Sequence, residues 1–145
     1  MAGYTVSAVT TAGSTTLPII SLYGGTTVRP KLRELHLFNT TATAVFLKLV
    51  RVTTTGTQGT ALTEVPLIPE DPAAIATAFN THTVAPTITT GDLWRGSLGA
   101  AIGSGVILTW PPPGLGIPPT ANNGLAVVVS TGTGQAVDAT LQWDE

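Results

Sequence analysis

The chain has 145 residues, no cysteine and a formal net charge of −2, and only 10% of its residues are charged. These values exclude disulfides and cysteine-based metal sites, and they argue against nucleic-acid binding, which needs a clustered basic surface. Soluble domains usually carry about 25% charged residues, so this threonine-rich surface repels its neighbours weakly and tolerates close association.

The length predicts a single domain over residues 1–145. The N-terminus shows no basic segment followed by an apolar run, so we expect no secretory signal. The stretch from Gly96 to Val137 contains no charged residue or histidine, but glycine and proline interrupt it too often for a spanning helix of about 20 apolar residues. We therefore expect this stretch to be buried in the domain or covered by another protein, and we expect no membrane partner.

Threonine, valine, glycine and proline favour strands and turns. Residues 3–11 alternate in character and predict a first strand, and Leu17 to Tyr23 predicts a second that ends at two glycines. Lys31 to Asn39 and Thr43 to Val52 form the clearest hairpin candidate, because both alternate and only a short polar connection separates them. Thr53 to Thr60 is polar and predicts a loop.

A strand around Ala61 to Leu67 is followed by the only helix signal, at about residues 71–80. Asp71 suits the N-cap of a helix, and Pro72 suits its first position, where a missing N–H costs nothing. The alanine-rich segment up to Phe79 gives about two turns. We expect this short helix to cover one open end of a sandwich.

The second half of the chain again predicts strands. We expect them at residues 81–90, 92–101, 106–110, 125–131 and 135–143, with a tight turn at Asn122-Asn123-Gly124. With the strands before them they number eight to ten and are separated by polar turns. The sequence therefore predicts an all-β protein, an antiparallel jelly-roll-like β-sandwich with one short helix.

No motif indicates catalysis. A hydrolytic triad needs a base beside a nucleophile, and the chain has only two histidines, His36 and His82. Ser104 lies in Ile-Gly-Ser-Gly, which a turn explains as well as a nucleophile does. His36, His82 and Asp92 are possible metal ligands, but their spacing supports no site. We predict that the protein is not an enzyme and binds no cofactor.

Five of the six basic residues fall between positions 29 and 51. They are Arg29, Lys31, Arg33, Lys48 and Arg51. One interpretation is that they are ordinary solvated strand ends. The other is a docking patch for an acidic protein surface, where charge sets the orientation of the partner.

The segment 111–123 cannot form a regular ladder, because its prolines lack the N–H donor. Leu115 and Ile117 are nevertheless apolar. We therefore predict a proline-rich arm that contacts a neighbouring molecule through Pro112, Leu115, Ile117 and Pro118.

The three tryptophans could form a sugar-binding platform, although aromatic rings are more common in cores and Trp143 has the phase of a core residue. A glycan site also needs clustered polar side chains. Asp92, Trp94 and Arg95 form the only compact set of this kind. Glycan binding through these residues is the alternative hypothesis.

Several segments resemble small virion structural proteins of tailed bacteriophages. They are Leu35 to Leu47, Thr54 to Gly59, Thr81-His82-Thr-Val, and Thr131 to Gln135 with the terminal Trp143-Asp-Glu145. The resemblance covers most of the chain. It implies a β-sandwich that assembles as an oligomer, often a trimer, on the capsid exterior or in the tail.

We therefore expect a non-enzymatic capsid decoration or cement protein, made in the host cytoplasm and located on the exterior of the virion. Its expected partners are further copies of itself, as a homotrimer, and the major capsid protein. The alternative is a tail-associated module that recognises a host glycan. The two hypotheses differ in where the copies lie on the particle and in whether a sugar is bound.

Overall fold

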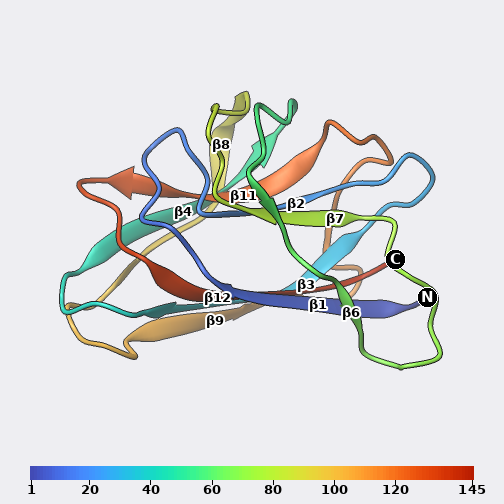
Figure 1. The fold of residues 1–145 in the computed structure, drawn as a ribbon, viewed down its shortest axis with the longest axis horizontal. Coiled ribbons are helices and arrows are strands. Elements are labelled where there is room, and N and C mark those ends of the chain that lie inside the picture. Colours follow the sequence, from blue (N-terminus) through green and yellow to red (C-terminus); the bar gives the residue numbers. More distant parts are fainter.

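A computed structural model describes all residues from Met1 to Glu145. It contains twelve β-strands and no helix, and the strands form two six-stranded antiparallel sheets. Figure 1 shows the two sheets as two layers, with both chain termini at the same end of the molecule. The prediction of an all-β protein with antiparallel sheets is confirmed.

The first sheet, sheet A, holds both ends of the chain. Its strand order is β10-β3-β12-β1-β6, and β9 also pairs with β3. The strands are β1 (Gly3–Val9), β3 (Lys31–Asn39), β6 (Val65–Pro66), β9 (Gly105–Thr109), β10 (Leu115–Gly116) and β12 (Val137–Asp144).

The second sheet, sheet B, has the order β5-β7-β2-β11-β4-β8. Its strands are β2 (Ile20–Tyr23), β4 (Val45–Val52), β5 (Thr60–Ala61), β7 (Thr77–Asn80), β8 (Ile88–Leu98) and β11 (Gly124–Thr131). The chain changes sheet many times, so strands that are neighbours in sequence often lie in opposite layers.

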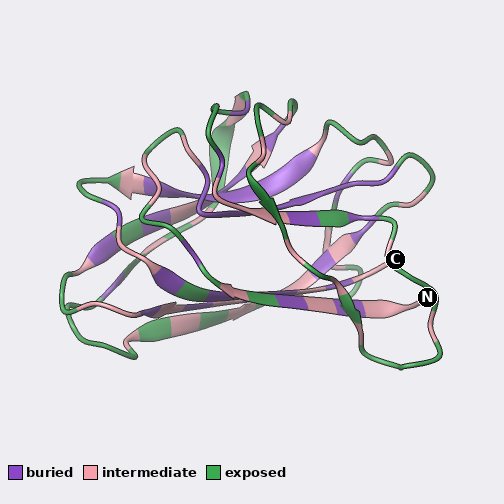
Figure 2. Ribbon diagram, in the orientation of Figure 1, coloured by how far each residue is buried: buried purple, intermediate pink, exposed green.

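The main core lies between the two sheets and contains 22 buried hydrophobic residues. Because side chains alternate along a strand, one face of each strand contributes to it. In β12 the inward residues Val137, Ala139, Leu141 and Trp143 are at most 3% exposed, as the sequence predicted for Trp143. Figure 2 shows the buried residues concentrated on the strands and the exposed residues in the connections.

A second cluster lies on the outer face of sheet B. It contains Tyr23, Val50, Val52, Ala126 and Val128, all at most 1% exposed, with Phe79 and Ile88 packed against it. Loops on that side make contact with it, and the hydroxyl of Tyr23 donates to the Thr54 carbonyl at 3.5 Å. Sheet B is therefore buried on both faces in its centre.

The predicted hairpin of residues 31–39 and 43–52 is wrong. β3 belongs to sheet A and β4 to sheet B, so the connection between them crosses from one layer to the other. The Asn39 side chain secures this corner, since its amide donates to the carbonyls of Thr43 at 2.7 Å and Gly99 at 2.8 Å. Both strands thereby turn their leucines towards the same core from opposite sides.

The predicted helix at 71–80 is also wrong, because residues 77–80 form β7 and pair with β2. Ala76 and Ala78 are fully buried, whereas Thr77 between them is exposed, which is the period of a strand. Two isolated helical turns are only marginally stable. Pairing with β2 instead gives the backbone a ladder partner and buries the alanines.

Candidate interaction surface at the terminal end

The end of the sandwich that carries both termini, here called the terminal end, is closed by backbone pairing. The N–H of Ala2 donates to the carbonyl of Glu145 at 2.9 Å, and the N–H of Glu145 donates to Ala2 at the same distance. The Glu145 carboxylate accepts from the N–H groups of Ile75 and Ala76 at 3.0 and 3.1 Å. These contacts hold both termini and the chain before β7 together.

A pocket of about 340 Å³ opens at this end between the start of β3 and the proline-rich arm. Its lining combines Arg29, Lys31 and Arg51 with arm residues from Pro113 to Pro118. Arg51 donates from Nη1 to the Gly116 carbonyl at 2.8 Å, which ties the arm to β4. The basic residues and the arm, two separate features of the sequence, meet here, and we call this the basic pocket.

The basic residues divide into two groups by their partners. Arg33 pairs with Asp144 at 3.3 Å, and Lys48 pairs with Asp92 at 3.3 Å. Arg29, Lys31 and Arg51 belong to none of the four ion pairs in the structure. Of the five basic residues predicted to form a docking patch, three therefore make no ion pair, and these three line the pocket.

The arm is less free than its prolines suggested. Leu115 and Gly116 pair with Leu32 and Lys31 of β3, and Leu115 is half-buried against the core. Ile117 is 1% exposed within the main core, so it is not available to a partner. Pro112 and Pro118 are exposed and remain candidates for contact.

Glycine is needed where the arm passes β2. A Cβ at Gly24 would lie 2.4 Å from the Pro118 carbonyl, so any side chain there would push the arm away. The close approach places Ile117 in the core. Pro118 then lies at the rim of the basic pocket.

Exposed apolar side chains gather at the same end. Met1 is 88% exposed, Leu67 55% and Ile68 56%, and Ile75 is 47% exposed. Met1 and Ile75 line a second pocket of about 380 Å³, together with Val28, the neighbour of Arg29 in the sequence. The terminal end thus carries both exposed apolar side chains and the three cations that make no ion pair.

The glycan candidates lie on β8 and are already engaged. Asp92 pairs with Lys48 and with Arg95, the latter at 2.9 Å. Burial acts to raise the pKa of Asp92, but hydrogen bonds from Arg95 and Lys48 outweigh it and hold the pKa below its ordinary value. Trp94 packs against the main core, as does Trp110, so the tryptophans form no exposed platform.

His82 lies in a buried contact above the outer face of sheet B. Its Nε2 is 2.8 Å from the Ser21 hydroxyl, and its ring lies 6.1 Å from that of Tyr23. Burial lowers the pKa of His82 below its ordinary value, and this effect outweighs the backbone of Thr55, which acts to raise the pKa. The Nδ1 atom is buried and has no hydrogen-bond partner of good geometry. Ser21 is 1% exposed, so this pair of residues is closed to a substrate.

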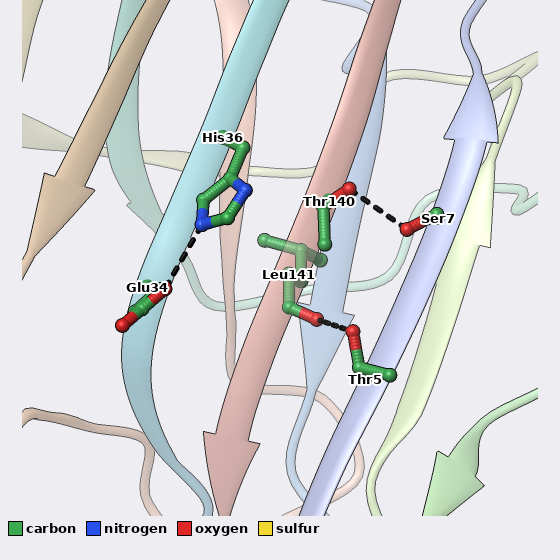
Figure 3. A network of polar contacts seen from close by, with 6 residues as sticks. All are labelled: Thr5, Ser7, Glu34, His36, Thr140 and Leu141. Carbon is green, nitrogen blue, oxygen red and sulfur yellow. Dashed lines mark hydrogen bonds and ion pairs between the residues drawn. The ribbon is translucent and has the colours of Figure 1, made fainter. Parts of the chain in front are cut away.

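His36 lies on the outer face of sheet A, where its Nε2 is 2.9 Å from Glu34. Figure 3 shows this pair beside Thr140 and Ser7, whose hydroxyl groups are 2.7 Å apart. The structure does not bring His36, His82 and Asp92 together, and no group of three His, Asp or Glu side chains is placed to hold a metal ion. The Ser104 hydroxyl accepts a hydrogen bond from the Gly99 N–H at 2.9 Å, within a loop, and contacts neither histidine.

Sequence reasoning missed the second cluster and the Ser21–His82 contact. A signal was present, because Val50 and Val52 follow Leu49 on the opposite face of β4, and residues 125–129 form an unbroken apolar run. Such strands are typical of sheets covered on both faces. Which loop supplies the cover could not be read from the sequence.

The structure contains no helix with the length and hydrophobicity needed to cross a membrane. No protein-family model matches the chain, and no curated protein or solved structure matches it either.

Proposed function

We propose that the protein is a non-enzymatic structural component of a tailed-bacteriophage particle, a decoration or cement protein that binds the exterior of the head shell and stabilises it. The observation that carries this proposal is the terminal end, which carries both exposed apolar side chains and a pocket with three cations outside ion pairs. Such a surface has the apolar area and the orienting charge of a protein interface.

The strand order supports the finer assignment to a jelly roll. Eight of the strands run β1-β12-β3-β9 in sheet A and β2-β11-β4-β8 in sheet B. This order follows from two Greek keys, the topology of jelly rolls, which occur in viral capsid and lectin domains. Fold alone does not assign function, so the order supports the proposal only as an analogy.

The alternative, a tail-associated module that binds a host glycan, has weaker support. Its candidate residues Asp92 and Arg95 are paired with each other, and Trp94 packs inwards. A glycan array with the purified protein, together with the position of the copies on the particle, separates the two hypotheses.

The test compares particles that carry the protein with particles that lack it, by heating and by indentation. A protein that binds only the assembled shell stabilises it by RT ln(1 + [L]/Kd), so particles lacking it should rupture at lower temperature and lower force. Equal stability of the two particles, or copies found only on the tail, would overturn the proposal.

A matched pair of variants tests whether the terminal end is the attachment surface. Ile75→Ser removes an apolar side chain at this end that is 47% exposed, and Ile102→Ser removes one that is 76% exposed, in the loop after β8. That loop lies at the far end of β3, since the Gly103 N–H donates to Asn39. We expect only Ile75→Ser to reduce cosedimentation with particles.

A further inference from the structure

We propose that the basic pocket receives the Glu70 carboxylate of a second copy of this chain, so that the protein forms a closed ring in which each loop 67–71 docks on its neighbour. This inference adds an assembly to the proposed function. Ring formation does not depend on that function; only the attachment of the ring to a phage particle rests on it.

The pocket lacks a negative partner. Among the acidic groups nearby, Asp144 lies opposite Lys31 in the β3–β12 register, but its carboxylate pairs with Arg33. The Glu145 carboxylate is occupied by two backbone N–H groups before β7. The three cations of the pocket are therefore free to bind a carboxylate from outside the protomer.

Most carboxylates of the chain cannot be that group. Glu34 contacts His36, Glu64 accepts from the Ala78 N–H at 3.0 Å, and Asp92 pairs with two cations. Asp71 is half-buried, with Oδ2 enclosed and without a hydrogen-bond partner. Only Glu70 and Asp138 are exposed and make no ion pair.

Glu70 has the better setting of these two. Asp138 lies within β12 and pairs there with Val9 and Phe38, on the face of a sheet. Glu70 lies in the loop after β6, which extends away from the sheets at the lower right of Figure 1. The exposed Leu67 and Ile68 precede it and would meet the apolar proline walls of the pocket.

Within one protomer this contact is not made. Asp71 and Pro72 at the base of the loop line the second pocket, and no residue of the loop lines the basic pocket. Loop and pocket nevertheless share the terminal end. In the proposed ring, rotation about an axis beside that end brings the loop of one copy to the pocket of the next, and this heterologous contact repeats until the ring closes.

The experiment measures the oligomeric state by sedimentation equilibrium over micromolar concentrations, at low and high salt. We expect an oligomer that dissociates more readily at high salt, because screening weakens the contact. Glu70→Lys should raise the dissociation constant by on the order of tenfold or more, the value of one or more charge-assisted contacts. Asp138→Lys makes the same charge change outside the contact and should leave the constant unchanged.

Charge reversal provides the decisive variant. Arg29→Glu lowers the formal charge of the pocket from three positive charges to one and should also raise the dissociation constant. Because Arg29 and Glu70 act in one contact, the double variant Arg29→Glu with Glu70→Lys should weaken the oligomer by less than the sum of the two single changes. A monomer at all concentrations, an oligomer insensitive to Glu70→Lys, or two single changes whose effects simply add in the double variant would overturn the inference. Particle binding measured separately would still stand if the ring fails, and a ring that binds no particle would refute only the proposed function.

Discussion

The outer face of sheet B is covered by loops, whereas the outer face of sheet A is open to solvent. On sheet B the covered side chains are apolar and include Tyr23 and Val128, with one buried polar contact between Ser21 and His82. On sheet A the outward side chains include hydroxyls and one histidine–glutamate pair (Figure 3), together with the exposed Val9 and Ile107.

This difference predicts which face contributes to the free energy of unfolding and which face tolerates substitutions. Apolar burial contributes roughly 25 cal/mol per Å² removed from water, and polar contacts at the surface contribute little. We therefore expect the loops over sheet B to act as part of the folded core. The open face of sheet A should accept substitutions with little cost, although it belongs to the sheet that holds both termini.

The largest expected effect comes from truncating matched aromatic side chains on the two faces. Tyr23→Ala removes a fully buried ring beneath the loops and should lower the free energy of unfolding by about 3–5 kcal/mol. Phe38→Ala removes a half-buried ring from the outer face of sheet A and should cost about 1 kcal/mol. Urea denaturation of both variants measures the difference; equal losses would mean that the loops over sheet B contribute no core.

A smaller effect is expected from a matched pair of serines. Ser21→Ala leaves the buried His82 Nε2 without a partner and should cost about 1–3 kcal/mol. Ser7→Ala breaks an exposed contact with Thr140, so its effect should stay within about 0.5 kcal/mol. Chemical denaturation under the same conditions gives both values. A larger loss of unfolding free energy for Ser7→Ala than for Ser21→Ala would contradict the expected difference between the two faces.

The smallest effect is expected from pH. Burial lowers the pKa of His82 below its ordinary value of 6.5, so in the window below pH 6.5 the unfolded chain binds a proton that the folded chain refuses. The stabilisation is complete above pH 6.5 and is lost as the pH falls towards the folded pKa, by at most about 1.4 kcal/mol per pH unit. Melting temperatures measured from neutral pH downwards should show this loss.

Variants assign the pH dependence to one histidine. His82→Gln should remove the loss below pH 6.5, at the cost of some stability at neutral pH. His36→Gln, on the open face of sheet A, should retain it. A pH dependence that survives His82→Gln would assign the titration to another group.

The sequence predicted strands most accurately where polar and apolar residues alternate. The strand at residues 3–11 and the strand at 135–143 are β1 and β12 with small changes at their ends. The boundary expected near Gly91 does not exist, because β8 runs through it, with a register shift opposite Val50 and Val52 of β4. A glycine with φ of 96° can be accommodated inside a strand at such a bulge.

For the candidate site, the sequence named Arg29, Lys31 and Arg51 and the proline-rich arm, but treated them as separate features. It could not show that Arg33 and Lys48 are neutralised, because their partners Asp144 and Asp92 are far away in the chain. It also placed Ile117 on the surface, since an apolar residue between Gly116 and Pro118 gives no sign of the core it enters.

The sequence by itself determined that the protein is built from strands, that its surface is weakly charged and that its cations are concentrated in one region. These properties depend on composition and local alternation. Only the tertiary structure decided that β3 and β4 lie in different sheets, that residues 77–80 are a strand and that three cations share a pocket. In each case the deciding contact comes from another segment of the chain. Asn39 secures the corner between β3 and β4, β2 pairs with residues 77–80, and the proline-rich arm returns to the start of β3.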